Sequence, residues 1–230
     1  MEHPILFMTV LFEKIGLGEF AHHYPQLVNS WLAMIILILM AIWAKSSIRP
    51  LVPTKVQNVW ELIIGGLEEF TVGITGEEGR PYYPLVATLF IYIFLCNVMG
   101  LAPGLMAPTA NLNTNLSMAV VGVIFAEFVG LKKHGAKYIK HYTGPILPLA
   151  ILFIPIEIIG RLARILSLTF RLFGNIVAKE LIIGLLIFLA GAYLAPVPLY
   201  FLFILLCFIQ AFIFYMLCTM YIAGAIEEAH

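Results

Sequence analysis

Charged residues are scarce in this chain: they make up 11% of its 230 residues, and aspartate is absent, so every acidic side chain is a glutamate. Hydrophobic residues make up 62%, against roughly 45–50% in a typical soluble domain. A soluble fold of this size could not bury so much apolar surface, which predicts a protein whose solvent is the lipid bilayer. The formal net charge of +0 also lacks the basic excess that nucleic-acid-binding proteins use to attract phosphates.

The motifs of several enzyme and metal-binding classes are absent as well. The three cysteines, Cys96, Cys207 and Cys218, lie inside apolar runs without a CxxC pair, so neither a disulfide nor a metal site is expected. The chain has no glycine-rich phosphate loop, no HExxH zinc motif and no GxSxG nucleophile motif. We therefore predict a protein that binds no cofactor and is not an enzyme on its own.

Long apolar runs predict membrane-embedded helices. The runs Leu27 to Ala44, Pro84 to Leu101 and Leu116 to Leu131 are each long enough to span much of a hydrocarbon core about 30 Å thick. Between the first two, Val56 to Ile74 carries apolar residues at helical spacing, interrupted by glutamine and glutamates. This pattern predicts an amphipathic helix on the membrane surface.

The last two apolar segments are too long for upright spans. Pro148 to Ala190 stays apolar for about 43 residues, roughly 64 Å of helix and twice the thickness of the hydrocarbon core. A steeply tilted or broken helix fits this length, with Pro155 as a candidate kink. Val197 to Ile226 is also overlong. We predict an all-α polytopic membrane protein with five membrane-embedded helices, the last two long and tilted, and one amphipathic surface helix.

The basic residues of the loops predict the orientation. They gather after the first span and after the third, whereas the other side holds a single lysine: Lys45, Arg49, Lys55 and Arg80; Lys132, Lys133, Lys137 and Lys140; and Lys14. Because cytoplasmic loops carry the excess of Lys and Arg, the N-terminus is expected outside and the C-terminus in the cytoplasm. The N-terminal residues resemble neither a cleavable signal nor a transit peptide, which favours a bacterial plasma (inner) membrane.

We expect one membrane domain with three parts: an outer N-terminal segment (1–26), three spans with the amphipathic helix (27–131), and a tilted hairpin (145–226). The fourth apolar segment, in this hairpin, holds six charged residues: Glu157, Arg161, Arg164, Arg171, Lys179 and Glu180. Since a charge at the bilayer centre costs roughly 2.5–3.5 kcal/mol, six in one segment require partners or a function.

Helical geometry sorts these residues by face and depth. At about 100° per residue, with Arg171 at zero, Arg164 lies at about 20°, Asn175 at about 40° and Glu157 also within about 40° of Arg171. Glu180 lies on the opposite face, roughly 13 Å further along the helix. Arg171 is expected near mid-membrane, with Glu157 toward the inner end and Glu180 toward the outer end. Acids at two depths, separated by an arginine, are what two offset aqueous half-channels require.

Three motifs resemble those of one family. Ser167 to Asn175 (SLTFRLFGN), followed by Glu180, resembles the signature helix of the F-type ATP synthase subunit a. Gln210 to Phe214 (QAFIF) is similar to the last helix of that family, and Pro108 to Thr114 (PTANLNT) resembles its third motif. The motifs stand in family order, and length and hydropathy agree over essentially the whole chain.

The resemblance implies an ion-translocating stator subunit of a rotary ATP synthase, with protons as the default ion. Its partners would be an oligomeric rotor ring of hairpin subunits with membrane carboxylates, the peripheral stalk subunit b and, indirectly, the soluble ATPase sector. Arg171 would face the ring and make a passing carboxylate release its proton, because a nearby opposite charge favours the ionised carboxylate. An arginine also stays protonated at any working pH and blocks a direct leak between half-channels. The choice between proton and sodium would belong to the ring.

The resemblance also implies that six further polar residues line the ion path: Glu157 in the inner half-channel; Asn175, Glu180 and Gln210 around the arginine and the outer path; and Asn111 and Asn113 near the outer entrance. The chain departs from the family pattern at two positions. The family often has Asp where this chain has Asn111, and some members have His where it has Phe203. The outer path is therefore expected to rely on Glu180 and water.

Simpler interpretations of the same residues stay open. Glu157 could form an i,i+4 pair with Arg161, and Asn175 with Gln210 could bond two helices together. The remaining charged residues could be structural or could snorkel to the interface: Glu127, Arg161, Arg164 and Lys179. The alternative function is a secondary transporter with an arginine-centred site; it predicts an internal repeat, and none is visible.

Overall fold

Helices dominate the structure, a computed structural model that describes residues 18–49, 53–102, 104–135, 138, 150–190 and 196–227. Within these ranges the chain forms long α-helices and short 3-10 helices, without a strand. Three of the loop lysines used for orientation, Lys14, Lys137 and Lys140, lie outside the described residues, as does the start of the fourth apolar segment before residue 150. The prediction of an all-helical membrane protein is confirmed.

The first long helices begin and end at local signals. A short helix α2 (Gly18–His23) leads into α3 (Pro25–Ser46), which has a proline in its first turn, where the missing N–H is not needed. Helix α4 (Lys55–Thr75) is capped by Thr54, whose hydroxyl accepts a 3.1 Å hydrogen bond from the Gln57 backbone N–H. It ends at Gly76, which adopts a φ of 70° that favours glycine. Helix α4 is the predicted amphipathic helix.

The middle of the chain forms two spans joined by a polar turn. The 3-10 helix η1 (Glu77–Tyr82) leads into α5 (Tyr83–Met99), and η2 (Pro108–Ala110) precedes α6 (Leu112–His134). Asn111 caps α6, because its side-chain oxygen accepts a 2.8 Å hydrogen bond from the Asn113 N–H.

The last two helices are continuous. Helix α8 (Ala150–Ala190) has 41 residues and α9 (Pro196–Glu227) has 32. Helix α8 runs unbroken through Pro155, so the broken alternative is wrong. Prolines are tolerated in membrane helices where neighbouring groups satisfy the freed backbone. By length and composition, five helices could cross a membrane in the described part of the chain, in agreement with the prediction.

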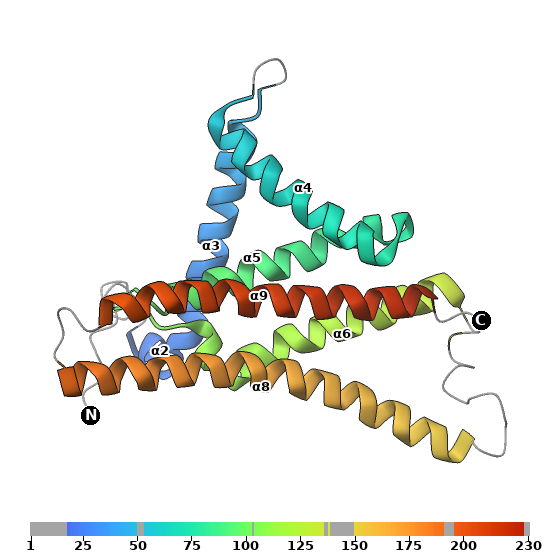
Figure 1. Ribbon diagram of the computed structural model, residues 1–230. Coiled ribbons are helices and arrows are strands. Elements are labelled where there is room, and N and C mark those ends of the chain that lie inside the picture. The colour runs from blue at the N-terminus through green and yellow to red at the C-terminus, as the bar shows by residue number, and fades with distance from the viewer. Residues whose placement is uncertain are drawn as a thin grey trace.

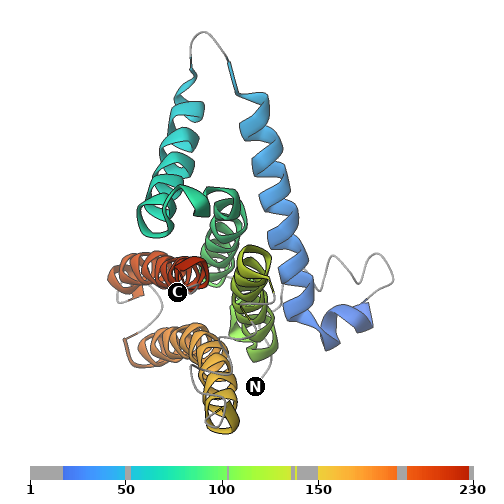
Figure 2. The ribbon, with the colours of Figure 1, turned by 90° about the vertical axis from the view of Figure 1, so that its right-hand side faces the viewer.

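The helices run in two directions. In Figure 1, α3 stands upright, whereas α8 and α9 lie across it, nearly parallel to each other. Figure 2 looks along the bundle of α5, α6, α8 and α9 and shows α3 and α4 as two arms that meet at the top. A 41-residue helix is roughly 62 Å long, so crossing a core about 30 Å thick from end to end requires a tilt of about 60°. The crossing of α3 by α8 agrees with the steep tilt that the lengths predict.

Small residues let α6 approach α9 closely. A side chain at Gly122 would come within 2.8 Å of Cys218 Sγ, so only glycine fits this contact. Ala119 and Ala126 on α6 and Ala211 on α9 are also buried. Interfaces of membrane helices favour small residues, because the association depends on close van der Waals contact rather than on expulsion of water.

Tyr215 on α9 links helix α4 to the bundle by hydrogen bonds. This fully buried side chain on α9 donates a 2.6 Å hydrogen bond to the Leu67 carbonyl oxygen of α4, and its hydroxyl also bonds the hydroxyl of Thr71. These two hydrogen bonds join residues that are far apart in the sequence. Both partners on α4 are thus satisfied in a part of the protein that water does not reach.

We expect Tyr215→Phe to destabilise the subunit by about 1–3 kcal/mol, because it leaves the Leu67 carbonyl and the Thr71 hydroxyl buried with one partner fewer. The measurement is the temperature at which the purified complex loses this subunit. Tyr82→Phe is the control, because Tyr82 is half-buried and packs its ring on Phe125. Equal transition temperatures for both variants would contradict the role of the Tyr215 hydroxyl.

Candidate functional site

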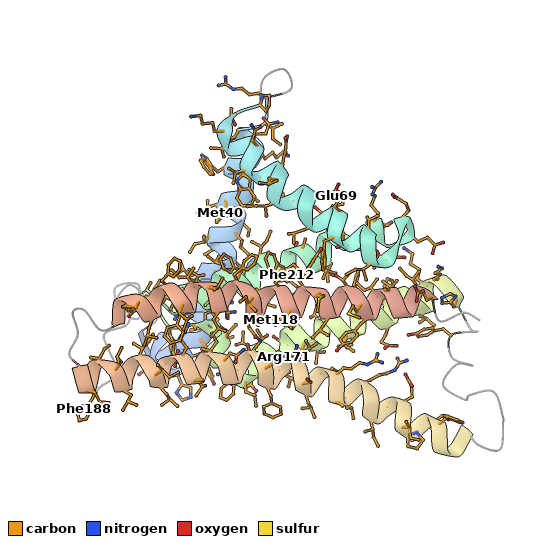
Figure 3. The ribbon with its side chains drawn as sticks, viewed as in Figure 1. Met40, Glu69, Met118, Arg171, Phe188 and Phe212 are labelled. Carbon is orange, nitrogen blue, oxygen red and sulfur yellow. The ribbon has the colours of Figure 1, made fainter. Side chains whose placement is uncertain are left out.

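A polar stripe runs along α8 beside its packing face. The packing face consists of Leu168, Leu172 and Ile176, all buried, and α8 contacts α6 extensively. Arg171 and Asn175 lie on the adjacent face of the helix, and both are half-buried. Figure 3 shows Arg171 near the middle of α8, on the side turned toward α9. Arg171 is therefore carried by the central part of the longest helix.

Arg171 has no intrachain counter-charge among the described residues: no ion pair joins it to Glu180, Glu157 or any other acid there. Its electrostatic neighbour on α9 is Tyr221, which also interacts with Arg164. The guanidinium of Arg164 lies over the Tyr221 ring, 5.1 Å from its centroid. An unpaired charge in a bilayer is costly, which sets Arg171 apart from the paired Arg161.

Asn175 and Gln210 join α8 to α9. The Asn175 side-chain NH₂ donates a 2.5 Å hydrogen bond to Gln210 Oε1. Gln210 is buried, whereas Asn175 is half-buried. The interpretation that these two amides bond the helices together is confirmed. The contact lies one turn from Arg171, so it also positions the α8 segment that carries the arginine.

An ionic cluster lies at the N-terminal half of α8. Arg161 pairs with Glu157 one turn away, at 3.2 Å, and with Glu127 on α6. Tyr138 donates a 3.0 Å hydrogen bond to Glu127 and lies under the Arg161 guanidinium. The expected Glu157–Arg161 pair is confirmed. The snorkelling interpretation of Arg161 is wrong, because its side chain is only 13% exposed.

A small polar cavity of about 90 Å³ opens beside this cluster. Glu127, Arg161, Arg164 and Tyr221 line it, together with the backbone around Gly224 on α9. A polar cavity of this size has room for water, which needs polar partners and a volume of roughly 30 Å³ per molecule in the liquid. On α8 the cavity is lined by Arg161 and Arg164, the second of which lies two turns before Arg171.

A second polar cluster lies on the other side of Arg171. Lys179 is buried and donates a 3.2 Å hydrogen bond to the backbone carbonyl of Asn97 on α5. Thr109 donates a 2.7 Å bond to Asn97 Oδ1, and the Asn115 side chain donates a 2.8 Å bond to the Thr109 carbonyl. The snorkelling interpretation of Lys179 is wrong, because only 2% of the residue is exposed. Lys179 lies one turn beyond Asn175, so the Asn175–Gln210 contact and this second cluster follow one another along α8.

Three buried polar atoms around this second cluster lack a protein partner in the described chain: Asn97 Nδ2, Asn115 Oδ1 and Gln210 Nε2. Buried polar atoms are nearly always hydrogen-bonded, to protein or to ordered water. Their position between η2 and the centre of α9 is the place where bound water would complete the network.

The remaining predicted site residues lie apart from Arg171. Glu180 is exposed on α8, and Asn113 is exposed at the start of α6. Asn111 is half-buried and caps α6. The sequence interpretation did not assign Asn97, Thr109, Asn115 or Tyr221 to the site. A single amide within the apolar run of α5 was the signal that could have revealed Asn97.

Beside Arg171, α8 exposes a face of small residues: Gly160, Ala163, Ser167, Gly174 and Ala178. A side chain added at Gly160 or Gly174 would meet no atom of this chain within 4 Å. A membrane helix of another subunit could approach this face as closely as α9 approaches α6.

Five apolar helices and a charged stripe within the longest of them define a polytopic helical membrane protein with an intramembrane ionic site. The family profile described as ATP synthase A chain matches residues 27–223. The chain belongs to this family, the a subunits of ATP synthases, which are membrane subunits of the F-type complex.

Full-length relatives agree with this assignment. A protein named ATP synthase subunit a from Desulfosudis oleivorans is 50% identical over 230 residues and covers all of both chains. One of the same name from Syntrophobacter fumaroxidans is 48% identical over 241 residues, again covering both chains completely. A third, from Nitratidesulfovibrio vulgaris, is 44% identical over all of this chain and 98% of its own. The family resemblance found in the sequence is confirmed.

Proposed function

We propose that this protein is the proton-translocating stator subunit of a rotary ATP synthase, with two offset half-channels separated by Arg171. The single observation that carries the proposal is the absence of an intrachain acid beside Arg171 within the described residues. Arg161 on the same helix is also largely buried, but it pairs with two acids, Glu127 and Glu157. Arg171 is therefore available to a carboxylate that arrives from outside the chain.

The availability of the Arg171 guanidinium to an external carboxylate determines the proposed proton transfer. A rotor carboxylate that moves to within about 4–6 Å of the guanidinium is stabilised in its ionised form, and so it releases its proton. On leaving, it regains a proton from the half-channel on the other side. The fixed positive charge of Arg171 repels a proton that would pass directly between the half-channels, and arginine does not lose its own proton at physiological pH.

The two polar clusters support the two half-channels. The cavity is lined by Glu127, Arg161 and Arg164, and Arg161 pairs with the proposed inner acid, Glu157. Asn175, Gln210, Lys179 and the η2 cluster extend from the other side. In this proposal Glu180, Asn111 and Asn113 belong to the outer path, where Glu180 is the acid that exchanges protons.

The partners follow the same assignment. The small-residue face of α8 would pack against the ring of hairpin subunits, while subunit b of the peripheral stalk and the soluble ATPase sector complete the complex. The N-terminus would lie outside a bacterial inner membrane and the C-terminus in the cytoplasm. The alternative is a secondary transporter with an arginine-centred substrate site.

Side-specific labelling tests the half-channels in the assembled complex. A cysteine placed at Gly224, which lines the inner cavity, should react with a membrane-impermeant thiol reagent added from the cytoplasmic side. A cysteine at Asn113 should react only from the outer side. The native cysteines Cys96, Cys207 and Cys218 are buried, and a variant with all three changed to serine supplies the background. Reaction of both positions from the same side would rule out offset half-channels.

A further inference from the structure

A second cavity, remote from the charged stripe, lies between α3, α4 and α5. Its volume is about 430 Å³. This lies within the range of about 300–1,000 Å³ that holds small-molecule ligands. In Figure 1, α3, α4 and α5 form the sides of a triangle, and the end of α3 and the start of α4 lie close together at its top. Most of its wall is apolar, from Leu37 on α3 to Ile64 on α4 and Ile91 on α5.

Apart from Thr88 on α5, the polar residues of the wall belong to the end of α3 and the first turns of α4. Lys45 contributes an ammonium and Glu61 a carboxylate, and Trp60 lies beside them. Both charged side chains are exposed, and in the described chain they form no ion pair with each other. Two opposite charges held apart at one end of an apolar cavity suit a ligand that carries both signs of charge at one end.

This polar end is held in place by hydrogen bonds. Thr54 donates a 3.2 Å bond to the Ser47 carbonyl, and the Arg49 N–H donates a 2.9 Å bond to Gln57 Oε1. Gln57 in turn donates a 2.8 Å bond to Glu61. These contacts set the angle between α3 and α4 and orient the carboxylate, so the cavity is formed before any ligand binds.

We propose that this cavity is a binding site for one phosphatidylethanolamine molecule, whose phosphate pairs with Lys45, whose ammonium pairs with Glu61, and whose acyl chain lies along the apolar wall. An anionic lipid would gain the Lys45 contact but place its charge beside Glu61. A helix of another subunit is the competing occupant, and the capture experiment below tests for it.

Photoreactive lipids test the site in the complete complex, reconstituted in lipid nanodiscs of phosphatidylethanolamine and phosphatidylglycerol. A trace of either lipid carries the same diazirine acyl chain, and mass spectrometry locates the labelled peptides. We expect the ethanolamine lipid to label the segment around Trp60 and Ile64 at least fivefold more than the glycerol lipid. Glu61→Gln should reduce this difference to less than twofold, and Lys45→Gln should reduce labelling by both lipids.

The controls are Glu69→Gln and Lys55→Gln, which remove an exposed charge from α4 without touching the cavity wall. Figure 3 shows Glu69 on the outer side of α4. Both controls should keep the wild-type labelling. Equal labelling of the wild type by the two lipids overturns the proposal, even if a variant fails to assemble. A photoreactive phenylalanine at Ile64 that captures another subunit instead of lipid overturns it too. These outcomes leave the role of Arg171 untouched.

Discussion

Replacing Arg171 by alanine is expected to abolish ATP-driven acidification of inverted membrane vesicles, lowering its rate at least 100-fold. In the proposed mechanism the guanidinium makes a passing rotor carboxylate release its proton and forms the barrier between the half-channels, so the substitution removes both functions. Arg171→Lys should be nearly as damaging, because an ammonium is a more compact, more strongly hydrated charge and lacks the planar fork that grips a carboxylate. The quenching of a pH-sensitive dye measures the acidification.

Arg80→Ala is the matched control, because Arg80 is an exposed arginine that pairs with Glu68 and Glu77 at 3.1 Å each. It should pump normally. Both variants must first be shown to retain the ring and the stalk on purification. Normal pumping by an assembled Arg171→Ala complex would remove Arg171 from the ion path, and the arginine-centred transporter would become the better account.

The second large effect is expected at Arg161. Arg161→Met should destabilise the subunit by about 3–5 kcal/mol, because it leaves Glu127 and Glu157 without their shared counter-charge in a largely buried cluster. The exposure of the two acids, 25% and 33%, places the expected value at the lower end of that range. The amount of subunit in the membrane and the temperature at which the complex loses it are the measurements.

A double substitution separates the effect of the lost charge from the effect of altered packing. Because replacing both partners of a buried ion pair by apolar residues is often neutral, Glu127→Leu combined with Arg161→Met should recover much of the lost stability. Lys133→Met is the control, since Lys133 pairs with Glu78 at the exposed edge, and such a pair contributes at most about 1 kcal/mol. If the Arg161 variant were no less stable than the Lys133 variant, the cluster would not have the stabilising role that its burial indicates.

Comparison of the helices with the predicted spans shows what hydropathy can locate. The predicted first span, Leu27 to Ala44, falls within α3, and the amphipathic segment Val56 to Ile74 falls within α4. The differences are confined to a few residues at the ends, where capping by Thr54 or a first-turn proline extends the helix. Pro155 did not break α8, since membrane helices tolerate a proline where the freed backbone groups find other partners.

Of the site, the sequence placed Arg171, Asn175 and Glu157 on one face of a helix, and the contacts of Asn175 and Arg161 agree with that geometry. It misjudged Lys179, since a lysine near a helix end usually reaches for the interface. Helix α5 instead supplies Lys179 with a buried acceptor, the backbone carbonyl of Asn97. Contacts of this kind join segments far apart in the chain, and no periodicity within one segment encodes them.

Apolar content, helix lengths and the position of an arginine within an overlong helix were determined by the sequence alone, because each depends only on residue type and on the rise of a helix. Tertiary structure decided the counter-charges: Arg161 receives Glu127 from another helix, while Arg171 receives no acid from the described chain. Coulomb energy depends on distances between side chains of different helices, and packing sets those distances. The packing of helices also forms the cavity between α3, α4 and α5, which no sequence motif predicts.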